Sequence, residues 1–150
     1  AEILRRLAAD LVAAGIDLSP ADGPARARIE RAVDLVKVRA RKLRDVIPQL
    51  WPFLDRPIAR DPEAVAKHLS SSDIGAHLAA WRERLQTVEP FDAQAIEAAL
   101  RSVALERDVK AGVLIHATRV AVTGQAVSPG LFDVLVVMGR DLAVSRLGDV

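Results

Sequence analysis

The sequence predicts an all-α fold made of two small helical subdomains. Apolar residues fill 51% of its 150 positions but aromatic residues only 3%, so alanine, leucine, valine and isoleucine must supply most of the core. Alanine favours helices over strands. The apolar positions mostly recur at helical spacing, and where one stretch could also form a strand, no partner strand is visible elsewhere. A chain of this length can bury one ordinary core or two small ones.

The first helix is predicted over residues 2–14. Its apolar positions share one helical face and are Ile3, Leu7, Leu11 and Ala14. Gly15 is a natural stop for this helix. In the connection that follows, Ser19 is a possible N-cap, and Asp22-Gly23-Pro24 reads as a further turn.

Residues 25–47 carry the clearest helical pattern and are predicted to form one continuous helix. The apolar positions that would share one face of this helix are Ile29, Val33, Val36, Ala40, Leu43 and Ile47. Basic side chains flank it, namely Lys37, Arg41 and Arg44 on one side with Arg39 and Lys42 further round. Between Arg26 and Arg44, eight Lys/Arg face two acidic residues, a local balance of +6 that leaves −5 for the rest of a chain with net charge +1. Such a stripe suits phosphates, and it is equally typical of a solvated helix face.

Three prolines, Pro48, Pro52 and Pro57, end this helix and make a stiff elbow around Trp51. The indole is a candidate for stacking on a base, or it packs the elbow against neighbouring helices. Asp61-Pro62-Glu63 then predicts a helix start, with a cap, a first-position proline and a favourable charge. A further helix ending near Thr87 is predicted by the spacing of Ile74, Leu78, Trp81 and Leu85.

The second half begins at Pro90, which is the candidate boundary between the subdomains. Asp92 is the predicted N-cap of the next helix, and Phe91 can pack on Ile96 as a hydrophobic staple. Branched residues make the stretch 113–122 ambiguous between helix and buried strand. Helix is favoured there because Gly124 fits a helix C-cap.

A helix restart at Ser128-Pro129-Gly130 is the most particular pattern in the chain. Ser128 is the expected N-cap, Pro129 the first helical position, and Gly139 the residue after the helix. The unpaired N–H groups of such a start suit phosphate oxygens and polar base edges. Arg119 would stand near it.

Several kinds of chemistry lack the residues they need. The chain has no cysteine, and His68, His77 and His116 do not fall in a metal-binding spacing. Glycine-rich phosphate loops and a nucleophile elbow around Ser70, Ser71 and Ser72 are also missing. Without a signal peptide or an apolar run of about 20 residues, the expectation is a soluble cytoplasmic protein that does not bind membranes. These residues indicate a binding module that is not itself catalytic.

The segment HATRVAVTGQAVSPGLFDVL resembles the C-terminal anticodon-binding region of bacterial glutamyl-tRNA synthetases, which are class I aminoacyl-tRNA synthetases. LVKVRARKLRDV and FDAQAIEAALRSVALERDVKAG extend the resemblance, which runs from about Ile29 to Leu147. It implies a helical cage that binds the anticodon stem-loop of tRNA(Glu). Residues 1–24 would be the joint to a catalytic body, 25–89 the first anticodon-binding subdomain, and 90–150 the second.

The resemblance also implies what lies outside this chain. The family's catalytic signatures have no counterpart here, so ATP-dependent attachment of glutamate, with ATP and Mg²⁺ as cofactors, belongs to a catalytic region of the parent enzyme. No cofactor is expected in this part, and a monomer is expected. Whether the parent charges only tRNA(Glu) or also tRNA(Gln), and whether Ala1 is a natural boundary, both stay open.

Carried over by motif, the resemblance assigns anticodon contacts to Arg119, Ser128, Pro129 and Leu131, and to Arg39 in the first subdomain. Arg41 and Arg44 are close rivals of Arg39, and together with Lys37 they are the expected backbone contacts. The chain departs from the family with Lys42 where a Thr is frequent and Ala117 where a Pro is frequent.

The residues alone leave other interpretations open. Ser128-Pro129 can be only a helix start, Leu131 only core, and Arg119 only a partner for a helix-terminal carbonyl or for Asp133. A helical scaffold whose basic helix docks an acidic protein is the main alternative function. A helical DNA-binding module is a third, disfavoured because no helix-turn-helix pair with a basic recognition helix is evident.

Overall fold

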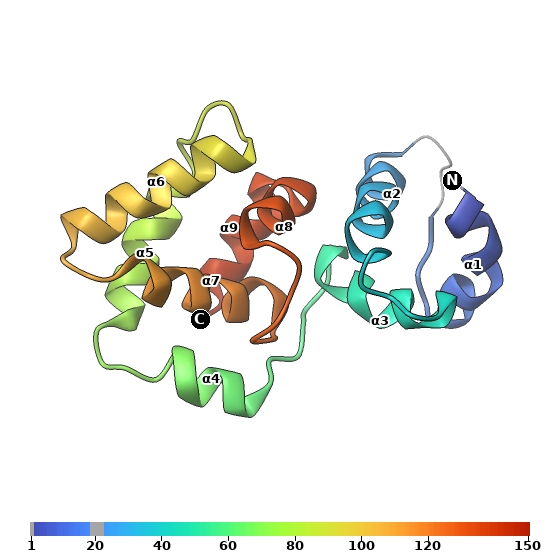
Figure 1. Cartoon of the computed structure of the whole chain (residues 1–150), viewed down its shortest axis with the longest axis horizontal. Coiled ribbons are helices and arrows are strands. Elements are labelled where there is room, and N and C mark those ends of the chain that lie inside the picture. The colour runs from blue at the N-terminus through green and yellow to red at the C-terminus, as the bar shows by residue number, and fades with distance from the viewer. Residues whose placement is uncertain (1, 19–22) are drawn as a thin grey trace. The chain divides into compact units, whose positions relative to one another are not determined.

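The computed structural model describes residues 2–18 and 23–150, and within those ranges it contains helices and no strand, which confirms the all-α prediction (Figure 1). The α-helices are α1 (Glu2–Ala13), α2 (Pro24–Val36), α3 (Val46–Leu50), α4 (Pro62–His68), α5 (Ile74–Leu85), α6 (Ala93–Glu106), α7 (Ala111–Thr123), α8 (Leu131–Met138) and α9 (Arg140–Gly148), with 3₁₀ turns η1 (Leu43–Asp45) and η2 (Trp51–Phe53). Ser19 and Asp22 lie outside the described residues. Across residues 2–18 and 23–150, no helix is both long enough and apolar enough for a membrane crossing.

The chain divides into two compact units, unit 1 over Ala1–Arg56 and unit 2 over Pro57–Val150. The subdomain boundary predicted at Pro90 falls inside unit 2, between α5 and α6, which pack against each other. The predicted joint over residues 1–24 falls inside unit 1, where α1 contacts α2 and η1.

Unit 1 builds its core from the apolar faces of its short helices. The leucines of α1 that recur at helical spacing are buried, and α3 and η2 close the core over α2. The buried apolar side chains are Leu4, Leu7, Leu11, Ile16, Ile29, Ala32, Val33, Val36, Val46, Leu50 and Phe53. The helix predicted at residues 2–14 is confirmed, and Gly15 follows it with φ +81°.

The continuous helix predicted over residues 25–47 is wrong. The first helix of this segment ends at Val36, residues 37–42 form an exposed connection, and a 3₁₀ turn starts at Leu43. One cause is charge, because Lys37 and Arg41 would be stacked one turn apart in a helix, where like charges repel. A second is local capping, because the Asp45 carboxylate accepts a hydrogen bond from the backbone N–H of Lys42 at 3.1 Å and so favours a new start.

Unit 2 is a bundle in which α5, α7 and α9 pack on one another and α6 covers α5, α7 and α8. Its centre holds Trp81, which is fully buried. The stretch left ambiguous between helix and strand is helical, as α7, and it ends at Gly124 with φ +78°. Asp92 is confirmed as the cap of α6, since its carboxylate accepts from the backbone N–H of Ala95 at 2.8 Å.

The predicted start of the last segment is also corrected. The N-cap of α8 is Gly130 and the helix begins at Leu131, so Ser128 does not cap it and Pro129 is not its first residue. The Ser128 hydroxyl is used elsewhere, because it accepts a hydrogen bond from Arg119 and donates one to the carbonyl of Pro129. Gly139 ends α8 as predicted.

Candidate nucleic-acid interface

Arg119 and Ser128 lie in contact at the surface of unit 2. The Nε–H of Arg119 donates to the Ser128 hydroxyl oxygen at 3.0 Å, and that hydroxyl donates to the carbonyl oxygen of Pro129 at 2.7 Å. All three residues are half-buried, so the pair is neither sealed in the core nor fully solvated. The structure therefore brings together three of the residues that the motif pointed to.

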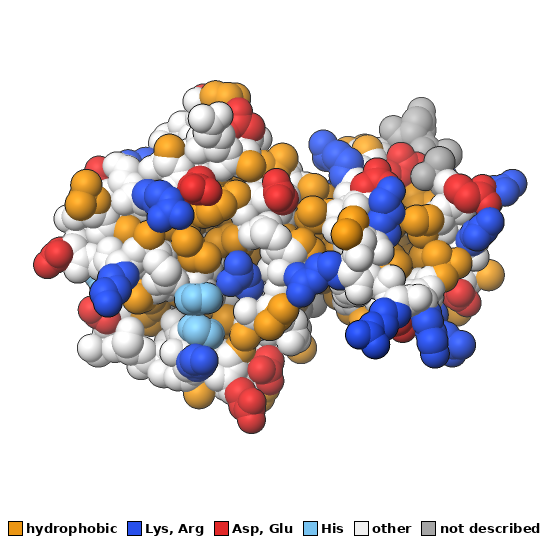
Figure 2. Space-filling view, in the orientation of Figure 1, with side chains coloured by type: hydrophobic (Ala, Val, Ile, Leu, Met, Phe, Trp, Pro, Cys, Tyr) orange, Lys and Arg blue, Asp and Glu red, His pale blue; other side chains and the backbone are white. Residues whose placement is uncertain are grey.

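The other flank of the Arg119 guanidinium faces a pair of histidines. Nη1 of Arg119 lies 3.3 Å from Nδ1 of His116, which is one turn earlier on α7. The ring of His116 stacks on that of His68, at the end of α4, with centroids 5.0 Å apart and planes 24° from parallel. Figure 2 shows two histidine side chains side by side on the molecular surface, with basic side chains on either side. Sequence reasoning missed this pair, since the two residues lie far apart in sequence and match no motif.

The histidine pair sits in a positive environment. The pKa of His68 lies below its ordinary value, chiefly because partial burial disfavours the imidazolium and then because His116, Lys67 and Arg119 repel its charge. A neutral His68 is therefore favoured beside Arg119.

The loop between α7 and α8 is fixed by Thr123. Its hydroxyl donates to the carbonyl of Arg119 at 2.6 Å and accepts from the backbone N–H of Gln125 at 3.1 Å. Val127, one residue before Ser128, is 71% exposed. The loop thus presents an apolar side chain next to the Arg119 and Ser128 pair, a combination suited to a splayed nucleotide.

Leu131 lies in the interior of unit 2, with only 2% of its surface exposed. It is the first residue of α8, directly after Pro129 and Gly130. Any effect of Leu131 on a bound nucleotide would therefore act through the packing of this helix start.

The front cations belong to unit 1. Lys37 is paired with Asp34 at 2.7 Å, and Arg39, Arg41 and Arg44 are exposed. Within the described ranges, no ion pair involves these three arginines. They form a solvated cluster on the connection after α2, which can meet phosphates without first breaking an ion pair.

Trp51 is half-buried and carries the guanidinium of Arg56 over its ring, 4.0 Å from the centroid. One face of the indole is therefore engaged by a cation from the same elbow. This arrangement favours the packing interpretation of Trp51 over base stacking.

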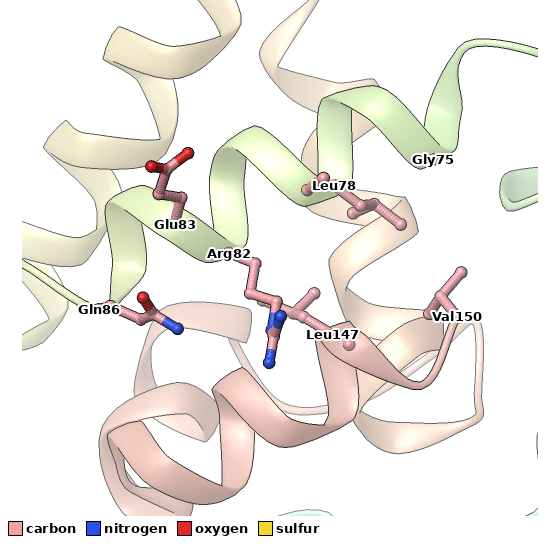
Figure 3. A pocket seen from close by; sticks show the side chains of 9 residues that line it. Gly75, Leu78, Arg82, Glu83, Gln86, Leu147 and Val150 are labelled. Carbon is pink, nitrogen blue, oxygen red and sulfur yellow. The ribbon is translucent and has the colours of Figure 1, made fainter.

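A cavity of about 380 Å³ opens between α5 and α9, and Figure 3 shows Arg82 reaching across it toward α9. The Arg82 Nε–H donates to the carbonyl of Val144 at 2.9 Å, which ties the two helices together. None of the residues predicted to bind RNA lines this cavity. Within the described part of the chain, no three metal-ligating side chains cluster.

Comparisons with known proteins identify the family of this chain. A family model described as "Anticodon binding domain" matches residues 3–150. Glutamate–tRNA ligase 2 of Koribacter versatilis is 42% identical over 132 residues, which is 88% of this chain and 27% of that protein. Glutamate–tRNA ligase of Nitrobacter hamburgensis is 38% identical over 144 residues, which is 95% of this chain and 30% of that protein. The chain thus spans less than a third of these relatives.

The fold has a solved counterpart. The crystal structure of a glutamate tRNA ligase from Elizabethkingia meningosepticum superimposes with a TM-score of 0.81 over 99% of this chain and 28% of that one. At 19% sequence identity, this similarity concerns the fold.

Proposed function

The chain belongs to the family of anticodon-binding domains, and we propose that it binds the anticodon stem and loop of tRNA(Glu). Its relatives are glutamate–tRNA ligases, so we further propose that it serves a ligase whose catalytic region attaches glutamate to tRNA with ATP and Mg²⁺. The proposed setting is the cytoplasm, and the proposed state is a monomer. The observation that carries the proposal is the Arg119–Ser128 contact beside an exposed loop.

Arg119 is suited to reading a base. A guanidinium presents paired N–H donors in a fixed plane, which match the acceptor edge of an unpaired base. The bond from Arg119 to Ser128 restricts the guanidinium before RNA arrives, which lowers the entropy lost on binding. Base contacts of this kind specify sequence, whereas phosphate contacts position the RNA.

The proposed backbone contacts in unit 1 are Lys37, Arg41 and Arg44, whereas Arg39 stays the proposed anticodon contact of this unit. Arg41 and Arg44 are exposed and Lys37 is paired with Asp34, so the two arginines are the stronger candidates for phosphates. The relatives give no support to the alternative of a docking scaffold for an acidic protein. An interaction that survives nuclease and recovers no tRNA would revive that alternative.

The test is binding of a synthetic RNA hairpin with the anticodon loop of tRNA(Glu), and of hairpins with altered anticodons, measured at one fixed salt concentration. Arg119→Ala should weaken binding of the matched hairpin by about 1–3 kcal/mol and reduce the preference for it. The matched control is Arg101→Ala on α6, which removes another surface arginine, one that pairs with its helix neighbour Glu97.

Both outcomes of this test are informative. Unchanged affinity and preference in the Arg119→Ala variant would sink the assignment of Arg119. An equal loss in the Arg101→Ala variant would reduce the effect to general charge.

A further inference from the structure

The contact between Arg119 and His116 suits one tautomer of the imidazole. A guanidinium has N–H donors and no acceptor, so a hydrogen bond to His116 requires a lone pair on Nδ1. The tautomer that can accept this hydrogen bond carries its ring proton on Nε2. Protonation of Nδ1 would replace the acceptor with a donor and place two positive groups 3.3 Å apart.

His68 holds the His116 ring in place. Its own ring stacks on His116 from α4, and α4 packs against α7. The stack limits rotation of an imidazole that is otherwise exposed. His116 and Ser128 therefore contact the Arg119 guanidinium from two sides, one on α7 and one on the following loop.

We propose that His116 is a positioning residue for Arg119: its neutral imidazole, held by His68, keeps the guanidinium in the orientation that reads an anticodon base, and protonation releases it. This inference rests on the function proposed above. It adds a pH-dependent control of base discrimination to the site.

The charged surroundings determine the sign of the pH effect. The groups acting on His68 are His116, Lys67 and Arg119, all of them basic. Acid adds charge to this cluster, which favours RNA phosphates, while it removes the acceptor that orients Arg119. Lowering the pH should therefore reduce the ratio of affinities for matched and altered anticodons, even where the affinity for the matched hairpin does not decrease.

The experiment compares matched and altered anticodon hairpins from about pH 8 to about pH 5, a range that spans the titration of histidine. In the parent chain the affinity ratio should fall by about fivefold toward acid, the equivalent of one net hydrogen bond. His116→Asn places an amide oxygen near the position of Nδ1 and does not titrate, so it should keep the ratio across the range. In the His116→Ala variant, the affinity ratio should be as low at every pH as that of the parent chain at acid pH.

Lys67→Ala is the matched control, because it removes a positive charge from the same cluster and leaves the acceptor in place. Its ratio at neutral pH should equal that of the parent. A ratio in the parent that is flat with pH, or an asparagine variant that behaves as the alanine variant, would overturn the proposal. Thermal unfolding of each variant verifies that the fold is retained.

A second readout does not need RNA. Nitrogen NMR of the free chain at neutral pH should show His116 with Nδ1 unprotonated, and His68→Ala should weaken that preference. A proton on Nδ1 would overturn the inference whether or not the hairpin binds. Failure of every hairpin to bind, together with the expected tautomer, would instead refute the proposed RNA function and leave only the contact between the side chains.

Discussion

Gly124 ends α7 in a left-handed conformation, and the segment before α4 passes directly over it. A Cβ at this position would lie 2.1 Å from the carbonyl oxygen of Ala59. The carbonyl of Gly124 also accepts from the backbone N–H of Asp61 at 2.7 Å, and Asp61 caps α4. Gly124 thus connects the end of α7 to the start of α4. Arg119 lies on α7, and His68 is the last residue of α4.

Gly124→Ala should destabilise unit 2 by more than the roughly 1–2 kcal/mol that the left-handed conformation costs a residue with a Cβ. The additional cost comes from displacing the backbone of Ala59. Chemical denaturation followed by circular dichroism measures the change. The matched control is Gly112→Ala, in the first turn of α7 with no neighbour near the new Cβ, which should be stabilising by about 0.5–1 kcal/mol. Equal effects of the two substitutions would contradict the crowding at Gly124.

For single residues, the sequence indicated that Arg119 and Ser128 lie close together, but it did not indicate which hydrogen bonds they make. The spacing of Arg119 and Ser128 predicted that they lie close together, and they do, because the loop between them is short and closed by Thr123. The cap expected from Ser128 was wrong because the hydroxyl has a stronger donor in Arg119. The stacking of His68 on His116 depends on the packing of two helices, which no local pattern encodes.

Helix starts in unit 2 follow local chemistry closely. The carboxylates of Asp61 and Asp92 both accept a hydrogen bond from the backbone N–H of the third residue of the helix that follows. Each satisfies a donor that the helix itself cannot, which is why both starts were predictable from sequence. The start of α8 was not, because a glycine precedes it and no side chain caps it.

Asp92→Ala should lower the free energy of unfolding by about 0.5–2 kcal/mol, because the N–H of Ala95 loses its acceptor. Asp92→Ser is the control, since a serine hydroxyl can accept the same hydrogen bond and should restore most of the loss. Urea denaturation distinguishes the two. A serine variant as unstable as the alanine variant would show that the carboxylate acts through something other than the cap.

Helices that end at a glycine were predicted correctly, as α1 and α7 show. The single helix predicted over residues 25–47 was wrong because nothing in its apolar pattern marks a stop. The apolar periodicity continues through the segment, whereas repulsion between clustered cations and the Asp45 hydrogen bond favour a break, and neither effect is visible in the apolar pattern.

Charge is unevenly divided over the whole molecule. The net charge is +1, but the segment from Arg26 to Arg44 carries +6, so the remainder is negative. Unit 1 holds that basic segment, while unit 2 holds Arg119 and the loop beside it. Under the proposed function, unit 1 supplies most of the salt-dependent affinity for the RNA backbone, and unit 2, through Arg119, supplies most of the choice of base.

Arg41→Gln and Arg44→Gln should each reduce the slope of log affinity against log salt concentration by about 0.7–0.9, the value for one lost phosphate contact. The affinity ratio between matched and altered anticodons should stay at the parent value, because a phosphate contact carries no base information. Lys37→Gln should have a smaller effect on the slope, since Lys37 must first leave Asp34 to reach a phosphate. Hairpin titrations at several salt concentrations measure both quantities. If the arginine variants changed the ratio and left the slope alone, the cations of unit 1 would be reading bases, and the division of roles between the units would have to be reversed.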